Sequence, residues 1–191
     1  MPTDTKASEA FDAAYTRLIG HEGFYSNDPD DTGGETFHGI SRVYNPDWPG
    51  WEYIDKAQDG EYALDVETLD RLARDFYIKT RWNVFRGDEV AAMDPALATT
   101  LLNISTHLIP STAVMYLQKA LNALNRDGAL YPDLKTDGNM GDKTIAATRA
   151  LCGAGDGGYL IKAIGIQQGM YYLNHAKEKF IRGFLNRVEI L

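Results

Sequence analysis

The sequence predicts a mainly α-helical protein that contains one small β-hairpin. Apolar residues recur at helical spacing along most of the 191-residue chain, whereas strand-like alternation is confined to residues near 36–44. The sequence contains no internal repeat and no segment with the composition of a linker. We therefore expect two helical lobes, residues 9–90 and 91–188, that share one core and form one compact unit.

The first predicted helix covers residues 8–21. Ser8 is a suitable N-cap, and its hydroxyl is expected to accept a hydrogen bond from the first turn. Four side chains then follow at spacings that place them on one face: Phe11, Tyr15, Leu18 and Glu22. Gly23 is expected to end this helix. The pattern therefore carries a carboxylate into an apolar face.

The rest of the chain alternates between expected loops and helices. Residues 24–41 are expected to form a loop or short hairpin, and residues 45–60 a turn-rich aromatic segment. Further helices are predicted over five ranges: 65–82, 95–107 after an Asp94-Pro95 cap, 112–124 after a Ser111 cap, 143–152, and 159–182. Gly87 is expected to terminate a helix, and the polar stretches 126–142 and 153–158 are expected to be loops.

Charge and composition exclude several classes of protein. The net charge is −8 and the pI is about 4.9, so a polyphosphate such as a nucleic acid is not an expected partner. The charge is uneven, with 9 basic and 19 acidic side chains in residues 1–90 and 10 and 8 in residues 91–191. Neither a signal-peptide h-region nor a run of about 18 apolar residues is present, so we expect synthesis in the cytoplasm without stable membrane insertion. A monomer is expected.

Glu22 and the loop after it suggest glycosidase chemistry. A carboxyl group on a buried face holds its proton to a higher pH, because burial disfavours the charged form. Such a group can donate its proton to a leaving oxygen, while a second carboxylate stabilises positive charge or positions water. Asp28, Asp30 and Asp31 follow in the loop, and Thr36 offers a hydroxyl. The alternative is a solvent-exposed Glu22 at a helix end with no chemical role.

Residues 22–41, EGFYSNDPDDTGGETFHGIS, resemble the signature of glycoside hydrolase family 108, the N-acetylmuramidases common in phage and prophage endolysins. The matching positions are Glu22, Gly23, Tyr25, Asn27, Asp28, Asp31, Gly33, Gly34, Thr36, Gly39 and Ile40. The sequence departs from the signature at Phe24 and His38, where glycine and tyrosine are usual. The resemblance implies a lysozyme-like α+β fold in which the hairpin lies next to the active-site cleft. It also implies that Glu22 is the catalytic acid; a helping role for Asp31 and a role for Thr36 rest on an analogy with phage lysozymes.

The second half resembles the peptidoglycan-binding-like region that accompanies this family. The motif TDGNMGDKTIAA, residues 136–147, carries Asp137, Gly138, Gly141 and Thr144 at the expected spacing. The two resemblances together extend from about residue 9 to 188. They imply that the partner is the glycan strand of bacterial peptidoglycan.

Other side chains suggest a substrate-binding surface but no metal or cofactor. Tyr25, Asp28, Thr36 and His38 lie in the motif, and Trp48 follows on the aromatic segment; these are the expected substrate-binding residues, with core packing as the alternative for Trp48. The loop from Asp28 lacks the ligand spacing of an EF-hand, and the histidines are not paired as zinc ligands. We expect neither a metal nor a cofactor.

The leading hypothesis is a muramidase that cleaves the β-1,4 bond between N-acetylmuramic acid and N-acetylglucosamine. A lytic transglycosylase, which cleaves the same bond without water, is the first alternative. A non-catalytic cell-wall-binding or phage structural protein is the second. Because the substrate of an endolysin lies outside the inner membrane, we expect the protein to act in the periplasm after a separate holin releases it. The choice between inversion and retention depends on the separation of the carboxyl groups and stays open.

Overall fold

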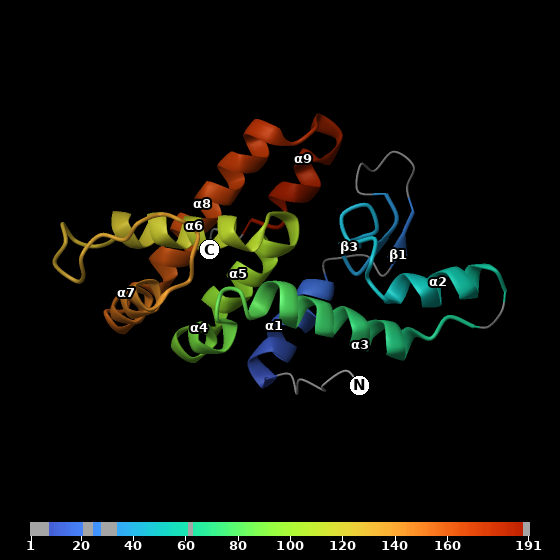
Figure 1. Ribbon diagram of the computed structural model, residues 1–191. Helices are drawn as coiled ribbons and strands as arrows, with labels where there is room; N and C mark the ends of the chain where they lie inside the picture. The colour runs from blue at the N-terminus through green and yellow to red at the C-terminus, as the bar shows by residue number, and fades with distance from the viewer. Residues whose placement is uncertain (1–7, 21–24, 28–33, 61–62, 189–191) are drawn as a thin grey trace.

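The computed structural model describes residues 8–20, 25–27, 34–60 and 63–188, and it confirms a mainly helical fold with a small antiparallel sheet (Figure 1). The sheet has the order β1-β2-β3, with bounds Tyr25–Ser26, Thr36–Phe37 and Ile40–Ser41. The helices before the centre of the chain are α1 (Glu9–Ile19), α2 (Gly50–Gln58), α3 (Val66–Tyr77), η1 (Ile78–Trp82) and α4 (Gly87–Met93). Those after it are α5 (Pro95–His107), α6 (Pro110–Ala123), α7 (Asp142–Gly153), α8 (Gly157–His175) and α9 (Glu178–Leu185).

Helix α5 lies at the centre of the molecule and joins its two parts. As predicted, Asp94 caps it: the carboxylate accepts hydrogen bonds from the backbone N–H groups of Ala96 and Leu97 at 2.9 and 3.1 Å. Helix α5 contacts α1 and α4 on one side and α6 and α8 on the other. In Figure 1 the strands and α2 lie to the right of it, and α6 and α7 to the left. The core is therefore shared by both halves of the chain.

Helix α1 begins as predicted and ends sooner. The Ser8 hydroxyl accepts a hydrogen bond from the backbone N–H of Phe11 at 3.1 Å. Phe11, Tyr15 and Leu18 are buried on the predicted face. The helix ends at Ile19 with Gly20 as its C-cap, before the predicted end at residue 21. Glu22 itself lies outside the described residues.

The predicted hairpin is formed by β2 and β3. Thr36 pairs with Ser41 and Phe37 with Ile40, and the two residues between them have positive φ angles, 46° at His38 and 78° at Gly39. Such a two-residue turn matches the twist of a hairpin, and glycine tolerates it without strain. Phe37 and Ile40 point into the core, which fixes the register because a slip of one residue would expose both.

The prediction of turns over residues 45–60 missed helix α2, which begins at Gly50 after Pro49. Proline suits the start of a helix because its φ is already helical. A Cβ atom on Gly50 would lie 2.1 Å from the ring of Trp48, so this glycine allows close packing rather than a turn. Trp48 and Trp51 are buried, at 5% and 3% exposure.

The helix predicted over 65–82 is two segments. Helix α3 passes into the π-helical turn η1, where the Asn83 backbone N–H bonds to the Ile78 carbonyl oxygen at 3.0 Å, five residues back. Gly87 begins helix α4 instead of ending a helix, so that prediction was wrong. A Cβ on Gly87 would lie 2.2 Å from the indole of Trp82, and this close approach explains the glycine.

Two further boundaries differ from the prediction. Helix α6 begins at Pro110 with Ile109 as its N-cap, so Ser111 is not the cap. The predicted helix 159–182 is divided into α8 and α9, because Ala176 and Lys177 have extended backbone angles. Within the described ranges, no helix has the length and apolar character needed to cross a membrane.

Candidate active-site cleft

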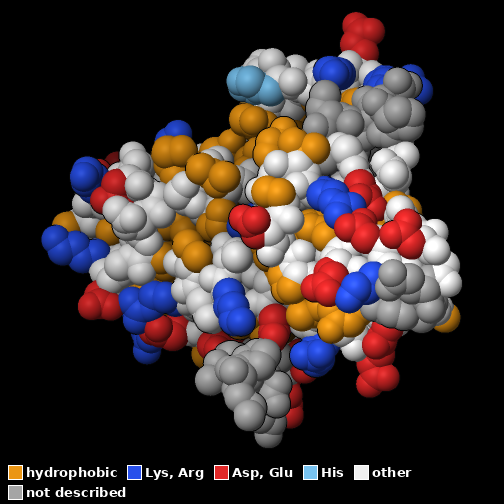
Figure 2. All heavy atoms as spheres, turned by 45° about the vertical axis from the view of Figure 1, so that its right-hand side comes forward, with side chains coloured by type: hydrophobic (Ala, Val, Ile, Leu, Met, Phe, Trp, Pro, Cys, Tyr) orange, Lys and Arg blue, Asp and Glu red, His pale blue; other side chains and the backbone are white. Residues whose placement is uncertain are grey.

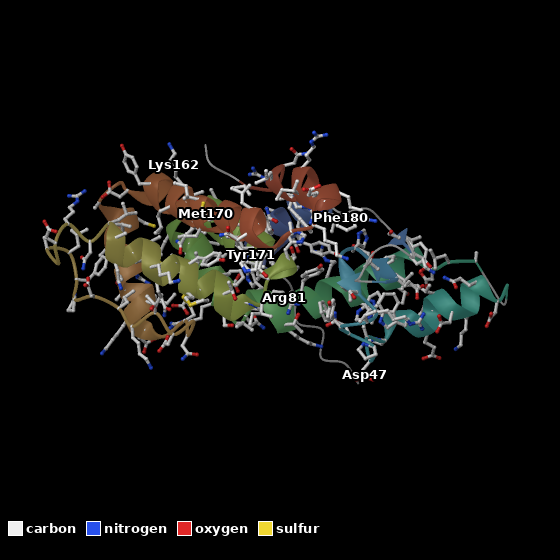
Figure 3. All side chains as sticks on the ribbon, turned by 90° about the horizontal axis from the view of Figure 1, so that it is seen from above. Asp47, Arg81, Lys162, Met170, Tyr171 and Phe180 are labelled. Carbon is white, nitrogen blue, oxygen red and sulfur yellow. The ribbon has the colours of Figure 1, made fainter. Side chains whose placement is uncertain are left out.

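A cleft lies between the β2–β3 hairpin and the C-terminal helices. It consists of two adjoining hollows of about 590 and 460 Å³. Both are lined by Gly39, Ser41, Tyr44, Thr106, His107, Leu108 and Tyr171. The first hollow extends to Phe76, Tyr77, Arg81 and Thr112, and the second to Thr36, Tyr172, His175, Phe184 and Arg187. Figure 3 shows Arg81 and Tyr171 near each other in the middle of the molecule.

The walls of the cleft come from parts of the chain that lie far apart in the sequence. The hairpin turn supplies Gly39 and Ser41, and the C-terminal end of α5 supplies Thr106 and His107. Tyr171 comes from α8. Seen from the face of Figure 2, hydrophobic side chains gather across the middle of the molecule, with charged side chains mostly toward its edges.

Aromatic contacts hold the C-terminal wall in place. The ring of Tyr171 stacks on His175 with centroids 4.5 Å apart, and Tyr172 stacks on Phe184 at 5.0 Å. Nη1 of Arg187 lies 2.9 Å from Nδ1 of His107, which links the region after α9 to the end of α5. These contacts fix the position of α9 against the end of the cleft.

The described residues that line the cleft differ in charge from the protein as a whole. Cationic or titratable basic groups line it at Arg81, His107, His175 and Arg187. No Asp or Glu is among the described residues that line either hollow. The protein as a whole has a net charge of −8. The described part of the wall therefore favours a ligand that carries negative charge.

Of the predicted site residues, Thr36 lines the cleft. It lies in β2 and is partly exposed. The predicted catalytic residues Glu22 and Asp31 and the predicted substrate-binding residue Asp28 lie outside the described residues. In the sequence, Glu22 falls between α1 and β1, and the segment 28–33 connects β1 to β2.

Tyr25 belongs to a polar network between the sheet and α2. Its hydroxyl donates to Oε1 of Glu35 at 2.8 Å and accepts from Nε2 of Gln58 at 2.8 Å. Arg42 bonds to the other oxygen of Glu35 at 2.6 Å and to both carboxylate oxygens of Asp55 at 2.8 and 2.5 Å. The hydrogen bonds from Arg42 lower the pKa of Asp55. Burial and the bond to Glu35 raise the pKa of Tyr25.

His38 and Trp48 lie behind the cleft wall. His38 is 6% exposed, and its backbone oxygen accepts a hydrogen bond from the Tyr77 hydroxyl at 2.8 Å. One face of Trp48 stacks on Phe37 with centroids 5.6 Å apart, and its Nε1–H donates to the backbone oxygen of Leu72 at 3.4 Å. Both side chains hold the hairpin against the helices.

No sequence pattern predicted Arg81, His107 or Tyr171 as cleft residues. They belong to three elements that no local motif connects, and only the packing of η1, α5 and α8 brings them together. A metal site is not evident in the described part of the chain, where no three His, Cys, Asp or Glu side chains form a group able to hold an ion. Burial raises the pKa of the Cys152 thiol.

Comparison with known proteins gives two family matches. Residues 15–107 match the family described as glycosyl hydrolase 108, and residues 112–189 match the family described as a predicted peptidoglycan domain. No curated protein matches the chain. SagA from Brucella abortus has a similar solved structure, with a TM-score of 0.67 and 24% identity over 95% of this chain and 91% of that chain. This likeness supports the fold.

Proposed function

The chain belongs to the glycosyl hydrolase 108 family and carries a C-terminal peptidoglycan domain, and from this premise we propose a specific reaction for its cleft. The protein is a peptidoglycan hydrolase. The proposed reaction is hydrolysis of the β-1,4 bond between N-acetylmuramic acid and N-acetylglucosamine. Glu22 is the proposed general acid.

The observation that carries this proposal is the composition of the cleft. Thr36, Ser41, Arg81 and His107 come from the region that matches the hydrolase family. Tyr171, His175 and Arg187 come from the region that matches the peptidoglycan domain. A glycan strand in the cleft would therefore contact both regions. Tyrosine rings and hydroxyl groups in the lining suit sugar rings and their hydroxyls.

In the proposed mechanism Glu22 protonates the glycosidic oxygen as the bond to the anomeric carbon breaks. Asp31 stabilises the positive charge that develops at this carbon or orients the attacking water. Thr36 binds the sugar directly, since its side chain lines the cleft. Asp28 is a further proposed substrate contact. His38 and Trp48 support the wall from behind, and Tyr25 links the sheet to α2, in keeping with their described contacts.

The test is digestion of purified peptidoglycan by the wild-type protein and by Glu22→Gln. Glutamine has nearly the same shape but cannot donate an acidic proton, so the rate of cleavage should fall by about a hundredfold or more. Circular dichroism and thermal unfolding control for folding. Wild-type activity in Glu22→Gln would refute the assignment of the acid.

Mass spectrometry of the products identifies the reaction. Hydrolysis adds one water and leaves a reducing N-acetylmuramic acid end, as we expect. An anhydro sugar end would instead identify a lytic transglycosylase. Absence of any new end, with retained binding to peptidoglycan, would identify a non-catalytic wall-binding protein.

We also propose that the protein acts on the wall during host-cell lysis, as a monomer, and that a separate holin gives it access to the periplasm. The support is its family, whose proposed substrate lies outside the inner membrane.

A further inference from the structure

Arg81 lines the cleft without an anionic partner in the described chain. Four other arginines, Arg42, Arg74, Arg86 and Arg126, each form an ion pair with a carboxylate. No described carboxylate lies within ion-pair distance of Arg81. Its Nη1 donates to the backbone oxygen of Thr80 at 3.2 Å, and its guanidinium lies 5.5 Å from the ring centroid of Phe76.

The Nε–H of Arg81 is buried and has no hydrogen-bond partner among the residues that the structure describes. Native proteins satisfy nearly all buried donors, because an unsatisfied donor gives up its bond to water and gains nothing in return. Burial lowers the pKa of Arg81, but arginine remains protonated in proteins. Arg81 thus places a positive charge and an N–H without a partner at the cleft wall. A bound anionic acceptor would pair with the charge and accept the hydrogen bond.

The π-helical turn accounts for this placement. Helix α3 buries Tyr77, and η1 buries Ile78 and Trp82 in the core. Between them, the wider turn directs Arg81 toward the cleft, as Figure 3 shows with Arg81 beside Tyr171. Single π-helical turns inside helices occur often at functional sites, since they alter which side chain faces a ligand.

The neighbours of Arg81 in the cleft are polar and uncharged or aromatic. Tyr44, Asn45, Thr106 and Thr112 line the same hollow, and no described acidic group does. The forked donors of a guanidinium match the two oxygens of a carboxylate. In a peptidoglycan strand N-acetylglucosamine has no carboxylate, whereas the lactyl group of muramic acid ends in one or continues into a peptide that bears carboxylates.

We propose that Arg81 is a specificity-determining residue that binds a carboxylate on the muramic acid side of the substrate. This inference rests on the proposed function, because it takes the glycan strand as the ligand. The carboxylate belongs either to the free lactyl group or to the attached peptide. Arg81 acts on binding and positioning, while proton transfer to the leaving oxygen belongs to another residue.

The test compares Arg81→Gln and Arg81→Lys with the wild-type protein on three substrates. These are peptide-bearing strands, strands freed of peptide by an amidase, and freed strands whose lactyl carboxylate is converted to its methyl amide. On the substrate whose carboxylate Arg81 binds, we expect Arg81→Gln to raise KM about tenfold or more, with a smaller change in kcat. Arg81→Lys keeps the positive charge and should therefore raise KM less than Arg81→Gln does. The methyl amide should be cleaved alike by all three proteins. Arg71→Gln, an exposed arginine of α3, is the matched control.

The pattern of losses identifies the source of the carboxylate. A loss on freed strands alone assigns the lactyl carboxylate, because the amidase exposes that group. A loss on peptide-bearing strands alone assigns a carboxylate of the peptide, and a loss on both means that Arg81 binds either one. Equal losses on the charged and the methyl amide strands, or no loss on any strand, would overturn the proposal.

Calorimetric binding separates this inference from the proposed function. Soluble fragments and their methyl amides are titrated into wild type and Arg81→Gln, which requires no turnover. If the wild type cleaves nothing yet prefers the charged fragment through Arg81, the proposed reaction fails and the inference stands. If the wild type cleaves strands but binds the charged fragment and its methyl amide equally well, the inference on Arg81 fails and the proposed function stands.

Discussion

Glu35 is the carboxylate of the motif that lies within the described residues, and it is fully engaged in hydrogen bonds. Glu35 is held at both oxygens, by Tyr25 on one side and Arg42 on the other. Arg42 in turn binds Asp55 of α2 and lies 5.1 Å from the ring centroid of Trp51. Glu35 therefore fixes the sheet to α2, and a carboxylate engaged in this way is poorly suited to give up a proton to a sugar. This favours Glu22 and Asp31 as the residues that carry the chemistry.

Among single residues of the motif, we expect Asp31→Asn to lower the cleavage rate, but less than Glu22→Gln does. Asparagine keeps the shape of the side chain and removes the charge that would stabilise the developing cation. Asp28→Asn and Asp30→Asn should be milder. Initial rates on one peptidoglycan preparation, with thermal unfolding as the folding control, rank the variants. A larger loss in Asp28→Asn or Asp30→Asn would place the helping carboxylate elsewhere in the loop.

Thr36 could be predicted from sequence, whereas the opposite wall of the cleft could not. Thr36 belongs to a local motif in which the spacing of residues is itself the signal. Arg81, His107 and Tyr171 become neighbours only through packing. His38 and Trp48 show a second limit, because neither a motif position nor an aromatic side chain predicts how deeply a ring is buried, and both rings are nearly inaccessible to solvent.

At the scale of elements, helical spacing and caps located most of the helices, although two of the predicted helices are each divided into two segments. Ser8 and Asp94 cap as expected, and α7 begins and ends within one residue of its prediction. The short helices α2 and α4 were missed because each begins with glycine, which usually indicates a turn. Gly50 and Gly87 instead give room to a tryptophan ring. These contacts depend on tertiary packing, which a local sequence pattern does not reveal.

We expect Gly87→Ala to destabilise the protein by about 1–3 kcal/mol, since the added Cβ would overlap the indole of Trp82. Gly158→Ala is the matched control: it lies in α8 with open space around it, and alanine favours a helix, so stability should be unchanged or rise by up to about 1 kcal/mol. Denaturant unfolding measures both. A neutral Gly87→Ala would mean that Trp82 can move aside at little cost.

At the scale of the molecule, the two family matches do not correspond to separate bodies. The matches divide the chain at residues 108–111, after α5, whereas the predicted lobes divide it before α5. Leu101, Leu102 and Ile104 of α5 are fully buried, and α5 contacts helices from both matched regions. Hydrolase and peptidoglycan regions thus share one core, and their relative position is set by folding.

We expect expression in a Gram-negative host to be harmless until the inner membrane is permeabilised, and lysis to follow afterwards. The proposed substrate is then reached only through a pore such as a holin. Culture turbidity with and without a permeabilising agent measures this, and Glu22→Gln is the control for hydrolysis. Lysis before permeabilisation would contradict the need for a separate holin.

The contrast between the acidic protein as a whole and the basic groups on the described wall of the cleft has a kinetic consequence. A cell wall rich in carboxylates repels a protein of net charge −8 at long range, while these basic groups attract carboxylates only within roughly 8–10 Å, the range that salt leaves unscreened. The enzyme is then kept from adhering to the wall through the rest of its surface. We therefore expect an encounter to last longer when a strand enters the cleft than when the cell wall meets any other part of the surface.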